Sequence, residues 1–129
     1  MILGVGTDLI SIKRIEDLML EFKEKFSAKV FSEYEIAQAK KTFSAAFFAK
    51  RFAAKEAFAK ALGTGIGRGV NFKDIEIFND DLGKPKIRLI NGKESFLQTH
   101  FGCKNIAIHL SISDEKTFAN AIVIIEKIS

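Results

Sequence analysis

A chain of 129 residues with 47% hydrophobic and 28% charged residues has the composition of one globular protein, so we expect a single domain over residues 1–129. No apolar run approaches the roughly 20 residues that span a bilayer, and the N-terminus lacks the features of a signal peptide, which predicts a cytoplasmic protein without a membrane partner. Cys103 is the single cysteine and cannot form an internal disulfide, while the net charge of +4 favours an acidic partner: nucleic acid, a phosphorylated ligand or an acidic protein.

The N-terminal segment predicts a strand followed by an amphipathic helix. Residues 2–10 form a short apolar run, and Gly4 and Gly6 within it mark places where another backbone or a ligand comes close. Asp8 stands at the end of this strand, and Ser11 can cap the helix that follows. The apolar positions of that helix recur at the helical period, at Ile12, Ile15, Leu18, Met19 and Phe22.

Two further helices are predicted before residue 63. Ser32 with Glu35 three residues later forms a capping box, which predicts a helix from Glu33 to about Lys41. No proline or glycine interrupts residues 43–62, and Gly63 is a natural helix stop. The sequence therefore predicts one long helix in front of Gly63.

The long helix is apolar on all sides, and its charges fall in two narrow strips. Glu56 and Lys60 share one strip, while Arg51 and Lys55 share another on the far side. A helix of this kind is normally buried, and a buried carboxylate costs several kcal/mol unless it is paired or binds a metal. Glu56 therefore needs a partner, and both an ion pair with Lys60 and a metal site are open.

The glycine-rich loop at residues 63–69, Gly-Thr-Gly-Ile-Gly-Arg-Gly, has the composition of a phosphate-binding loop. It follows a helix, however, whereas the dinucleotide and P-loop fingerprints follow a strand and open a helix. Neither fingerprint applies. Two interpretations stay open: a nest of backbone N–H groups for an anion, and a helix stop that leads into a hairpin.

The C-terminal half predicts strands and one short helix. Residues 74–77 and 86–89 alternate as half-buried strands do, and the turn formers between them predict a hairpin. A short helix capped by Asn91 should follow and close at Gly102, before two antiparallel strands at residues 106–113 and 119–126. On the first of these strands, His109, Ser111 and Ser113 share one face.

The order of these elements predicts an α+β fold. The strands are joined by connections too short for crossovers, so the sheet should be largely antiparallel, packed with a long buried helix and shorter helices. Asp8 and Glu56 offer two hard oxygen ligands of the kind that Mg²⁺ takes when substrate phosphates complete its shell. Lys60, His109 and Arg51 would then supply positive charge or hydrogen bonds to those phosphates.

Three motifs occur together in this chain. They are Gly6-Thr7-Asp8 near the start, Phe52-Ala53-Ala54-Lys55-Glu56-Ala57-Phe58-Ala59-Lys60 followed by Gly63-Thr64-Gly65, and His109-Leu110-Ser111-Ile112-Ser113. In their order and spacing the sequence resembles the holo-acyl-carrier-protein synthases, the small bacterial 4′-phosphopantetheinyl transferases, over nearly the whole chain. The middle motif is the specific one.

The resemblance implies the 4′-phosphopantetheinyl transferase fold and a Mg²⁺-dependent enzyme. Such an enzyme moves phosphopantetheine from coenzyme A to a serine of apo-acyl carrier protein, releases adenosine 3′,5′-bisphosphate and serves fatty acid biosynthesis. The family is typically a homotrimer with its sites at the subunit interfaces, and a long helix that is apolar all round agrees with such an assembly.

The resemblance also implies roles for individual residues. Asp8 and Glu56 match the metal ligands, and Lys60 matches a catalytic lysine placed to neutralise or protonate the leaving phosphate. Glu56 is expected to take the proton of the serine hydroxyl, directly or through a metal-bound water. The positions that match the coenzyme A site are Arg51, Lys60, Gly63, Thr64, Gly65, His109 and Ser111.

The carrier protein in this family is acidic, which makes the first helix the expected docking element, with Lys13 and Arg14 as its main cationic contacts and Lys23 and Lys25 as lesser ones. Two features depart from the family pattern. Asp114 stands where a second histidine is common, so no role of that histidine carries over. The first helix is also unusually acidic, which weakens a simple charge attraction and leaves the carrier preference open.

Three other functions could use parts of this sequence. The positive charge and thirteen phenylalanines could suit a basic nucleic-acid-binding module, but the cations are spread among acids and the phenylalanines follow core periodicity. A Mg²⁺-dependent nucleotide hydrolase could use the same ligands. A broad-specificity transferase for synthetase carrier domains is a further alternative, although such enzymes usually have two halves in one chain.

Overall fold

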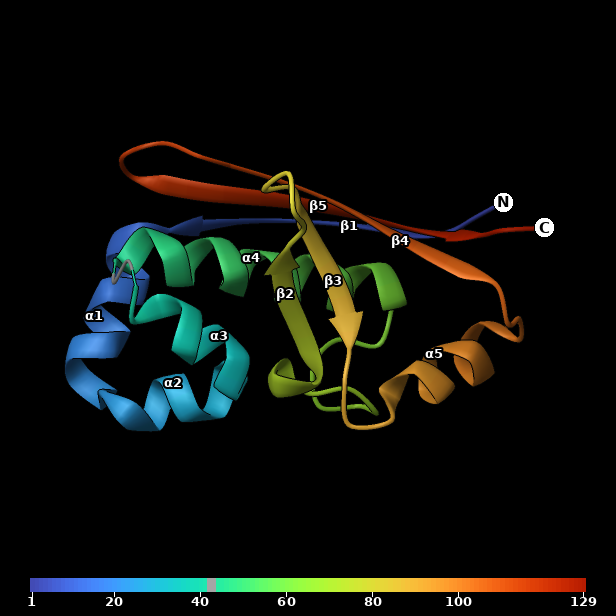
Figure 1. Ribbon diagram of the computed structural model, residues 1–129, viewed down its shortest axis with the longest axis horizontal. Helices are drawn as coiled ribbons and strands as arrows, with labels where there is room; N and C mark the ends of the chain where they lie inside the picture. The colour runs from blue at the N-terminus through green and yellow to red at the C-terminus, as the bar shows by residue number, and fades with distance from the viewer. Residues whose placement is uncertain (42–43) are drawn as a thin grey trace.

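The structure, a computed structural model, describes residues 1–41 and 44–129 and consists of three layers (Figure 1). One layer is an antiparallel sheet of strand order β1-β5-β4, formed by β1 (Ile2–Ser11), β5 (Phe118–Lys127) and β4 (Ile106–Asp114). The middle layer is helix α4 (Ala45–Leu62). The third layer contains α1 (Ile12–Phe22), α2 (Glu24–Val30), α3 (Glu33–Ala39), the 3₁₀ turn η1 (Phe72–Asp74), the hairpin of β2 (Ile75–Asn79) and β3 (Pro85–Leu89), and α5 (Lys93–Phe101).

Helix α4 is buried between the sheet and the third layer, as its all-round apolar surface predicts. Most of its residues are buried, including the charged Arg51 and Lys55. The helix begins at Ser44, whose side chain accepts a hydrogen bond from the Phe47 N–H, and ends at Gly63 in the left-handed conformation, with φ +85°. The part of the predicted long helix that falls at residues 42–43 lies outside the described residues.

Strand β1 lies directly on helix α4 because two glycines leave room for it. A Cβ atom at Gly4 would lie 1.9 Å from the Ala61 carbonyl oxygen, and one at Gly6 would lie 1.9 Å from the Ala57 carbonyl oxygen. No side chain fits at such distances. The prediction that another backbone approaches these glycines is therefore confirmed, and the backbone concerned is that of α4.

The helical layer agrees with the sequence except at α2. The Ser32–Glu35 capping box is present in full at the start of α3, and Ser11 caps α1 through the Arg14 N–H. Helix α2 was not predicted, because no capping residue precedes it. The chain instead breaks at Lys23, whose backbone has φ +48°, and this break separates α1 from α2.

The strands form two antiparallel sheets, where the sequence suggested one largely antiparallel sheet. The β2–β3 hairpin pairs Ile77 with Ile87 and packs across α4 as a separate two-stranded sheet. The expected cap of α5 is also wrong. Gly92 precedes that helix, and Asn91 instead donates a hydrogen bond to Asp74 Oδ1 at 2.9 Å, so its side chain holds the end of β3 to η1.

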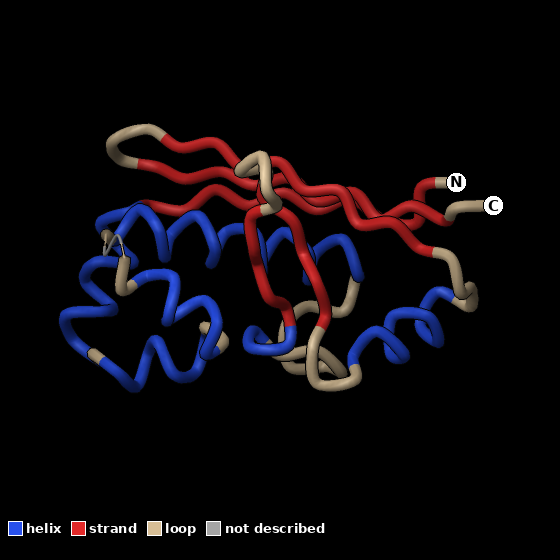
Figure 2. Tube along the Cα trace, viewed as in Figure 1, coloured by secondary structure: helices blue, strands red, loops and turns tan. Residues whose placement is uncertain are grey.

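The outer face of the three-stranded sheet carries no helix in the described part of the chain (Figure 2). Its exposed apolar side chains include Val5, Leu9, Phe118 and Ile122. At one end of this sheet the two ends of the chain are joined, since the Lys127 N–H donates to the Met1 carbonyl at 2.8 Å. Within the described residues, no helix has the length and apolarity needed to cross a membrane.

Candidate active site

The structure brings Asp8 and Glu56 to the same place. Gly4, Gly6 and Asp8 alternate along β1 on the face that meets α4, so the close backbone contact at Gly6 carries the Asp8 side chain to the next turn of the helix surface. After partial burial, the negative charge of Asp8 is the next cause that raises the pKa of the Glu56 carboxyl. The two carboxylates thus lie near one another, and their role as metal ligands stays a prediction.

Lys60 is the cation of this site, and it pairs with Asp8. Its Nζ lies 3.3 Å from Asp8 Oδ1 and donates to the Thr7 carbonyl oxygen at 3.0 Å. The alternative of a Glu56–Lys60 ion pair is not what the described residues form, because the ion pair of Lys60 is with Asp8. Lys60 thus bridges β1 and α4 while its own side chain stays accessible to a ligand.

The pKa of the Glu56 carboxyl is raised above its ordinary value, chiefly by partial burial and then by the negative charge of Asp8. The charges of Lys60 and Arg14 oppose this shift. A carboxyl in such surroundings holds a proton more readily than a solvated glutamate, and a nearby cation would release it. Both properties suit a group that accepts a proton during a reaction.

The two carboxylates suit Mg²⁺ bound in the way that leaves most of its coordination shell to ligands from outside the protein. Asp8 and Glu56 supply two carboxylates, and among residues 1–41 and 44–129 no group of three or more histidine, cysteine or acidic side chains could hold a metal. Mg²⁺ commonly binds one or two carboxylates together with waters and substrate phosphates. The site therefore suits a cation that arrives with, or is completed by, a phosphorylated ligand.

Arg51 lies away from the carboxylate pair, on the other strip of α4. It is 8% exposed and lies over the Phe47 ring, 3.5 Å from the ring centroid. Burial lowers the pKa of its guanidinium, and the charge of Glu35 opposes that effect. In the described residues its Nε has no hydrogen-bond partner, although its Nη1 donates to the Phe47 carbonyl at 3.4 Å.

Arg51 lines a cavity of about 190 Å³ between α4, the hairpin turn and the end of β4. The other lining residues are Lys50, Ile77, Asn79, Gly83, Pro85, Ile112 and Asp114. The cationic side chains of Lys50 and Arg51, against the single carboxylate of Asp114, make the lining of this cavity suitable for an anionic ligand. From the sequence, Asn79, Gly83 and Pro85 counted only among the turn formers of the hairpin and Lys50 was given no role, so this wall of the cavity was missed.

The glycine-rich loop is held at both ends by α5. The ring of His100 lies 2.9 Å from the Leu62 carbonyl oxygen, which can only accept, so Nε2 carries the proton. At the other end Gly69 has φ +104°, and a Cβ there would lie 2.3 Å from the Phe96 ring. The loop thus has a defined course between these two contacts.

The backbone of the loop is mostly engaged with the chain itself. The Gly63 and Gly65 N–H groups donate to the Ala59 carbonyl at 3.2 and 3.3 Å, and the Gly67 N–H donates to the Val70 carbonyl at 2.9 Å. The Thr64 hydroxyl donates to the Gly65 carbonyl at 3.1 Å. These contacts agree with a helix stop, and an anion would have to use other groups of the loop.

His109 and Ser111 do not approach Asp8 within one chain. They lie on the outer face of the sheet, in register with Ile124 and Ile122 of β5, whereas Asp8 faces α4. His109 Nε2 lies 3.0 Å from Glu126 Oε1, and both side chains are exposed. One chain therefore presents the predicted site residues on two different surfaces.

Arg14 and Lys13 lie in the first turn of α1. The charge of Arg14 lowers the pKa of the Glu56 carboxyl, which shows that it lies beside the site. Lys13 pairs with Asp17 at 3.2 Å on an exposed face, a contact that contributes little to stability. Both cations are thus available to a partner that approaches the mouth of the site.

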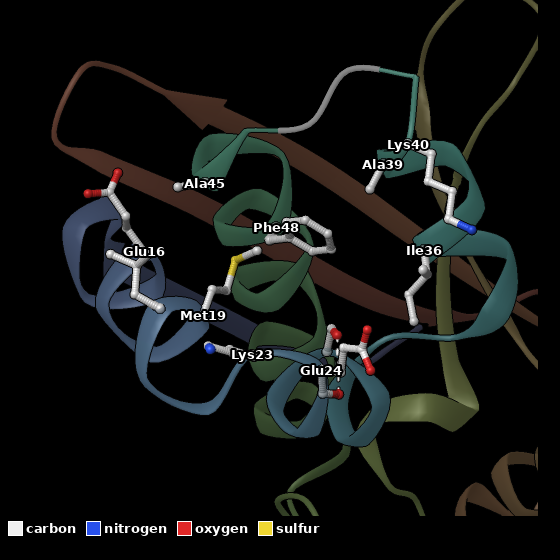
Figure 3. A pocket seen from close by; sticks show the side chains of 11 residues that line it. Glu16, Met19, Lys23, Glu24, Ile36, Ala39, Lys40, Ala45 and Phe48 are labelled. Carbon is white, nitrogen blue, oxygen red and sulfur yellow. Dashed lines mark hydrogen bonds between the residues drawn. The ribbon is translucent and has the colours of Figure 1, made fainter.

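An apolar pocket lies elsewhere, between α1, α2, α3 and the first turns of α4 (Figure 3). It has a volume of about 390 Å³, and Met19, Ile36 and Phe48 point into it. The charged residues among those that line it are Glu16, Lys23, Glu24 and Lys40. None of the catalytic, metal or coenzyme residues predicted from the sequence lines this pocket, which separates it from the site around Glu56.

The described fold and site define a class of protein: a small α+β domain in which a carboxylate pair and a lysine can hold a cation and a phosphorylated ligand. Residues 4–122 match the model of the 4′-phosphopantetheinyl transferase superfamily. A holo-[acyl-carrier-protein] synthase of Ruthia magnifica is 50% identical over 128 residues, and one of Buchnera aphidicola is 46% identical over 127 residues; each comparison covers 98% of both chains.

Solved structures agree with this match. The crystal structure of the holo-[acyl-carrier-protein] synthase from Neisseria meningitidis has a TM-score of 0.90 at 40% identity and covers 98% of this chain and 100% of its own. The Bacillus anthracis synthase, solved in complex with CoA (3′,5′-ADP), has a TM-score of 0.81 at 42% identity and covers 98% of each chain. The chain belongs to the holo-[acyl-carrier-protein] synthases of the 4′-phosphopantetheinyl transferase superfamily.

Proposed function

We propose that this chain transfers 4′-phosphopantetheine from coenzyme A to a serine of apo-acyl carrier protein and releases adenosine 3′,5′-bisphosphate. The observation that carries the proposal is the meeting of Asp8, Glu56 and Lys60 at the contact of β1 with α4, in a member of this family. We further infer Mg²⁺ as the cation, and a cytoplasmic setting in fatty acid biosynthesis, as the sequence resemblance implies.

The reaction is tested by incubating apo-acyl carrier protein with coenzyme A, Mg²⁺ and this protein, and measuring the intact mass of the carrier. We expect the mass of one phosphopantetheine group to be added, and no addition when a chelator removes the metal. A carrier whose mass stays unchanged across several candidates, at saturating coenzyme A and Mg²⁺, would overturn the proposal.

Each residue of the site has a part in this transfer. Glu56, with its raised pKa, takes the proton of the serine hydroxyl, directly or through a water, as the serine oxygen bonds to the β-phosphorus. The bond between that phosphorus and the bridging oxygen breaks, and Lys60 neutralises or protonates the leaving phosphate. Mg²⁺, held by Asp8 and Glu56, would supply charge neutralisation to the pyrophosphate.

The Arg51 cavity is the proposed place for the phosphorylated end of the donor. It supplies two cationic side chains, Lys50 and Arg51. Arg51 stands more than one helical turn before Glu56 on α4, so a donor whose pyrophosphate binds at the carboxylate pair could reach the cavity with its other end. The glycine-rich loop and Thr64 lie at the opposite end of α4, next to Lys60.

Replacing Arg51 with glutamine should weaken binding of adenosine 3′,5′-bisphosphate by about 10–100-fold, because a charged hydrogen bond is worth about 1.5–3 kcal/mol. Isothermal titration calorimetry measures this affinity. The fold should survive, since the guanidinium makes no ion pair and its burial already opposes its charge. Lys73→Gln, an exposed change away from the cavity, is the control; equal affinities of the two variants would contradict the placement.

We propose that the active assembly is a homotrimer with sites at the subunit interfaces. Two observations support this. The outer face of the sheet exposes large apolar side chains, Leu9 to 66% among them. The predicted coenzyme residues His109 and Ser111 lie on that same face, away from Asp8 of their own chain. A neighbouring chain packed on this face could bring His109 to another chain's Glu56.

Replacing Ile122 with aspartate should break the assembly, because it places a charge in the middle of the exposed apolar face. We expect a monomer in sedimentation velocity and at least about tenfold less transfer, since the site would lose the neighbour's histidine. Ala37→Asp, on the exposed surface of α3, is the control and should leave assembly unchanged. A wild-type protein that sediments as a monomer would itself refute the trimer.

The carrier protein is proposed to dock on α1 and α2. Lys13 and Arg14 lie at the mouth of the site, and a groove of about 280 Å³ further along is lined by Leu18, Phe22, Lys25, Phe26 and Lys29. Apolar side chains flanked by two lysines suit an acidic helix with an apolar edge. The acidic residues of the same helices, Glu16, Asp17, Glu21 and Glu24, restrict which acidic carriers fit.

A further inference from the structure

One edge of strand β2 is closed by a buried ion pair. β2 pairs with β3 on its other edge, so the backbone groups of Ile75 and Ile77 point away from β3 and towards α3 and α4. The Ile75 carbonyl accepts a hydrogen bond from Lys55 Nζ at 2.7 Å, and the Ile77 N–H donates to Glu35 Oε2 at 3.0 Å. Lys55 and Glu35 thus occupy the place of a neighbouring strand.

The pair is fully satisfied by its surroundings. Lys55 Nζ lies 2.7 Å from Glu35 Oε1 and also donates to the Phe72 carbonyl at 2.8 Å, while Glu35 Oε1 accepts from the Ser32 N–H at 2.8 Å. Both side chains are 0% exposed. A buried ion pair of this kind often contributes no more stability than well-packed apolar residues would. Its directional bonds, by contrast, fix the positions of α3, α4 and β2 relative to one another.

The hairpin so held forms one wall of the Arg51 cavity. Ile77 and Asn79 of β2 and Pro85 of β3 line the cavity on one side, and Arg51 lines it on the other. Lys55 stands one helical turn after Arg51 on the same strip of α4. The bonds from Lys55 and Glu35 to β2 therefore set the distance between the two walls of the cavity.

We propose that Glu35 and Lys55 are positioning residues for the donor substrate: by replacing a strand at the free edge of β2, they hold the hairpin at the distance from Arg51 that the phosphorylated end of the donor requires. This inference rests on the proposed function. An ion pair that only stabilised the fold would have no effect on donor binding.

The test separates position from stability with two double variants. Glu35→Leu with Lys55→Met removes both charges together, so neither is left buried alone, and it removes both bonds to the edge of β2. Glu35→Gln with Lys55→Gln also removes the charges but keeps an acceptor for the Ile77 N–H and a donor for the Ile75 carbonyl. Urea unfolding, amide exchange of Ile77, and calorimetry with adenosine 3′,5′-bisphosphate are measured for each.

We expect the Leu/Met variant to lose protection of the Ile77 amide, to bind adenosine 3′,5′-bisphosphate at least about tenfold more weakly and to raise the KM for coenzyme A in parallel. Its KM for the carrier protein should stay within about twofold, since α1 is untouched. The Gln/Gln variant should keep both the Ile77 protection and an affinity within about threefold of wild type.

A Leu/Met variant that folds, has an unprotected Ile77 amide and still binds with wild-type affinity overturns the inference. If that variant does not fold, the Gln/Gln variant decides. Positioning through the strand edge is refuted if this variant binds adenosine 3′,5′-bisphosphate with wild-type affinity although its Ile77 amide is unprotected. It is equally refuted if the variant loses that affinity although its Ile77 amide is still protected. Wild-type protein that binds no adenosine 3′,5′-bisphosphate contradicts the proposed function, whereas binding that is equal in wild type and a folded Leu/Met variant contradicts the inference alone.

Discussion

Replacing Glu56 with glutamine will lower the rate of phosphopantetheine transfer by about 10²–10⁴-fold, the range expected when a general base is lost. Glutamine has nearly the same shape but cannot take the serine proton, and its neutral amide is a poor partner for a divalent cation. The loss is measured from the intact mass of the carrier over time at saturating coenzyme A and Mg²⁺. Wild-type turnover under those conditions would show that Glu56 is neither base nor ligand.

The same substitution is expected to stabilise the fold although it slows transfer. Because the folded state raises the pKa of Glu56, it binds more protons than the unfolded state between the ordinary pKa of a glutamate and the raised value. The contribution of this group to stability is thus fully present at low pH and is lost as pH rises through that window. With chelator present, Glu56→Gln should unfold at a higher urea concentration than wild type near pH 7, and the difference should shrink towards pH 4.

Replacing Gly6 with alanine will destabilise the fold by about 3 kcal/mol or more, at the upper end of the cost of overpacking. The added methyl would lie 1.9 Å from the Ala57 carbonyl oxygen, and neither strand nor helix backbone can move aside without separating β1 from α4. Since that contact also brings Asp8 to Glu56, the folded fraction of the variant should show reduced transfer. Urea unfolding and the carrier mass assay measure the two effects.

Gly102→Ala is the matched control for this change. It adds the same methyl group at a residue with φ +66° and no neighbouring atom within 4 Å, so its cost should be limited to the left-handed backbone, about 1–2 kcal/mol. Transfer should be unaffected, because Gly102 ends α5 and is none of the predicted site residues. If Gly6→Ala cost no more than Gly102→Ala, the tight contact of β1 with α4 would be disproved.

The parts of the fold that depend on local sequence were predictable. The Ser32–Glu35 capping box, the stop at Gly63 and the alternation of the C-terminal strands are all in the structure. Helix α2 was not predicted because no residue with a capping side chain precedes it, and its start depends on the backbone break at Lys23. The separation of the strands into two sheets depends on how the hairpin packs across α4, which no local pattern determines.

The carboxylate pair could be predicted only in part from local sequence. The all-round apolar helix showed only that Glu56 needs a partner, and both an ion pair with Lys60 and a metal site stayed open. The pairing of Glu56 with Asp8 was expected mainly from the family motifs, because no local pattern shows which face of α4 strand β1 covers. Arg51 could be proposed as a phosphate contact, but its cavity could not be predicted, because a hairpin turn remote in sequence completes it. The opposite facing of His109 follows from the strand order β1-β5-β4, which periodicity alone leaves open.

The strand order also has a consequence for how the protein is made. β1 is an edge strand, and its hydrogen-bonded partner is β5, the last strand of the chain. Until β5 has been synthesised, β1, which carries Asp8, has no strand to pair with. The β1–β5 contacts join residues far apart in the sequence, and such contacts form slowly. Nascent and C-terminally truncated chains should therefore lack the site, so that only a completely translated molecule can begin to modify its carrier.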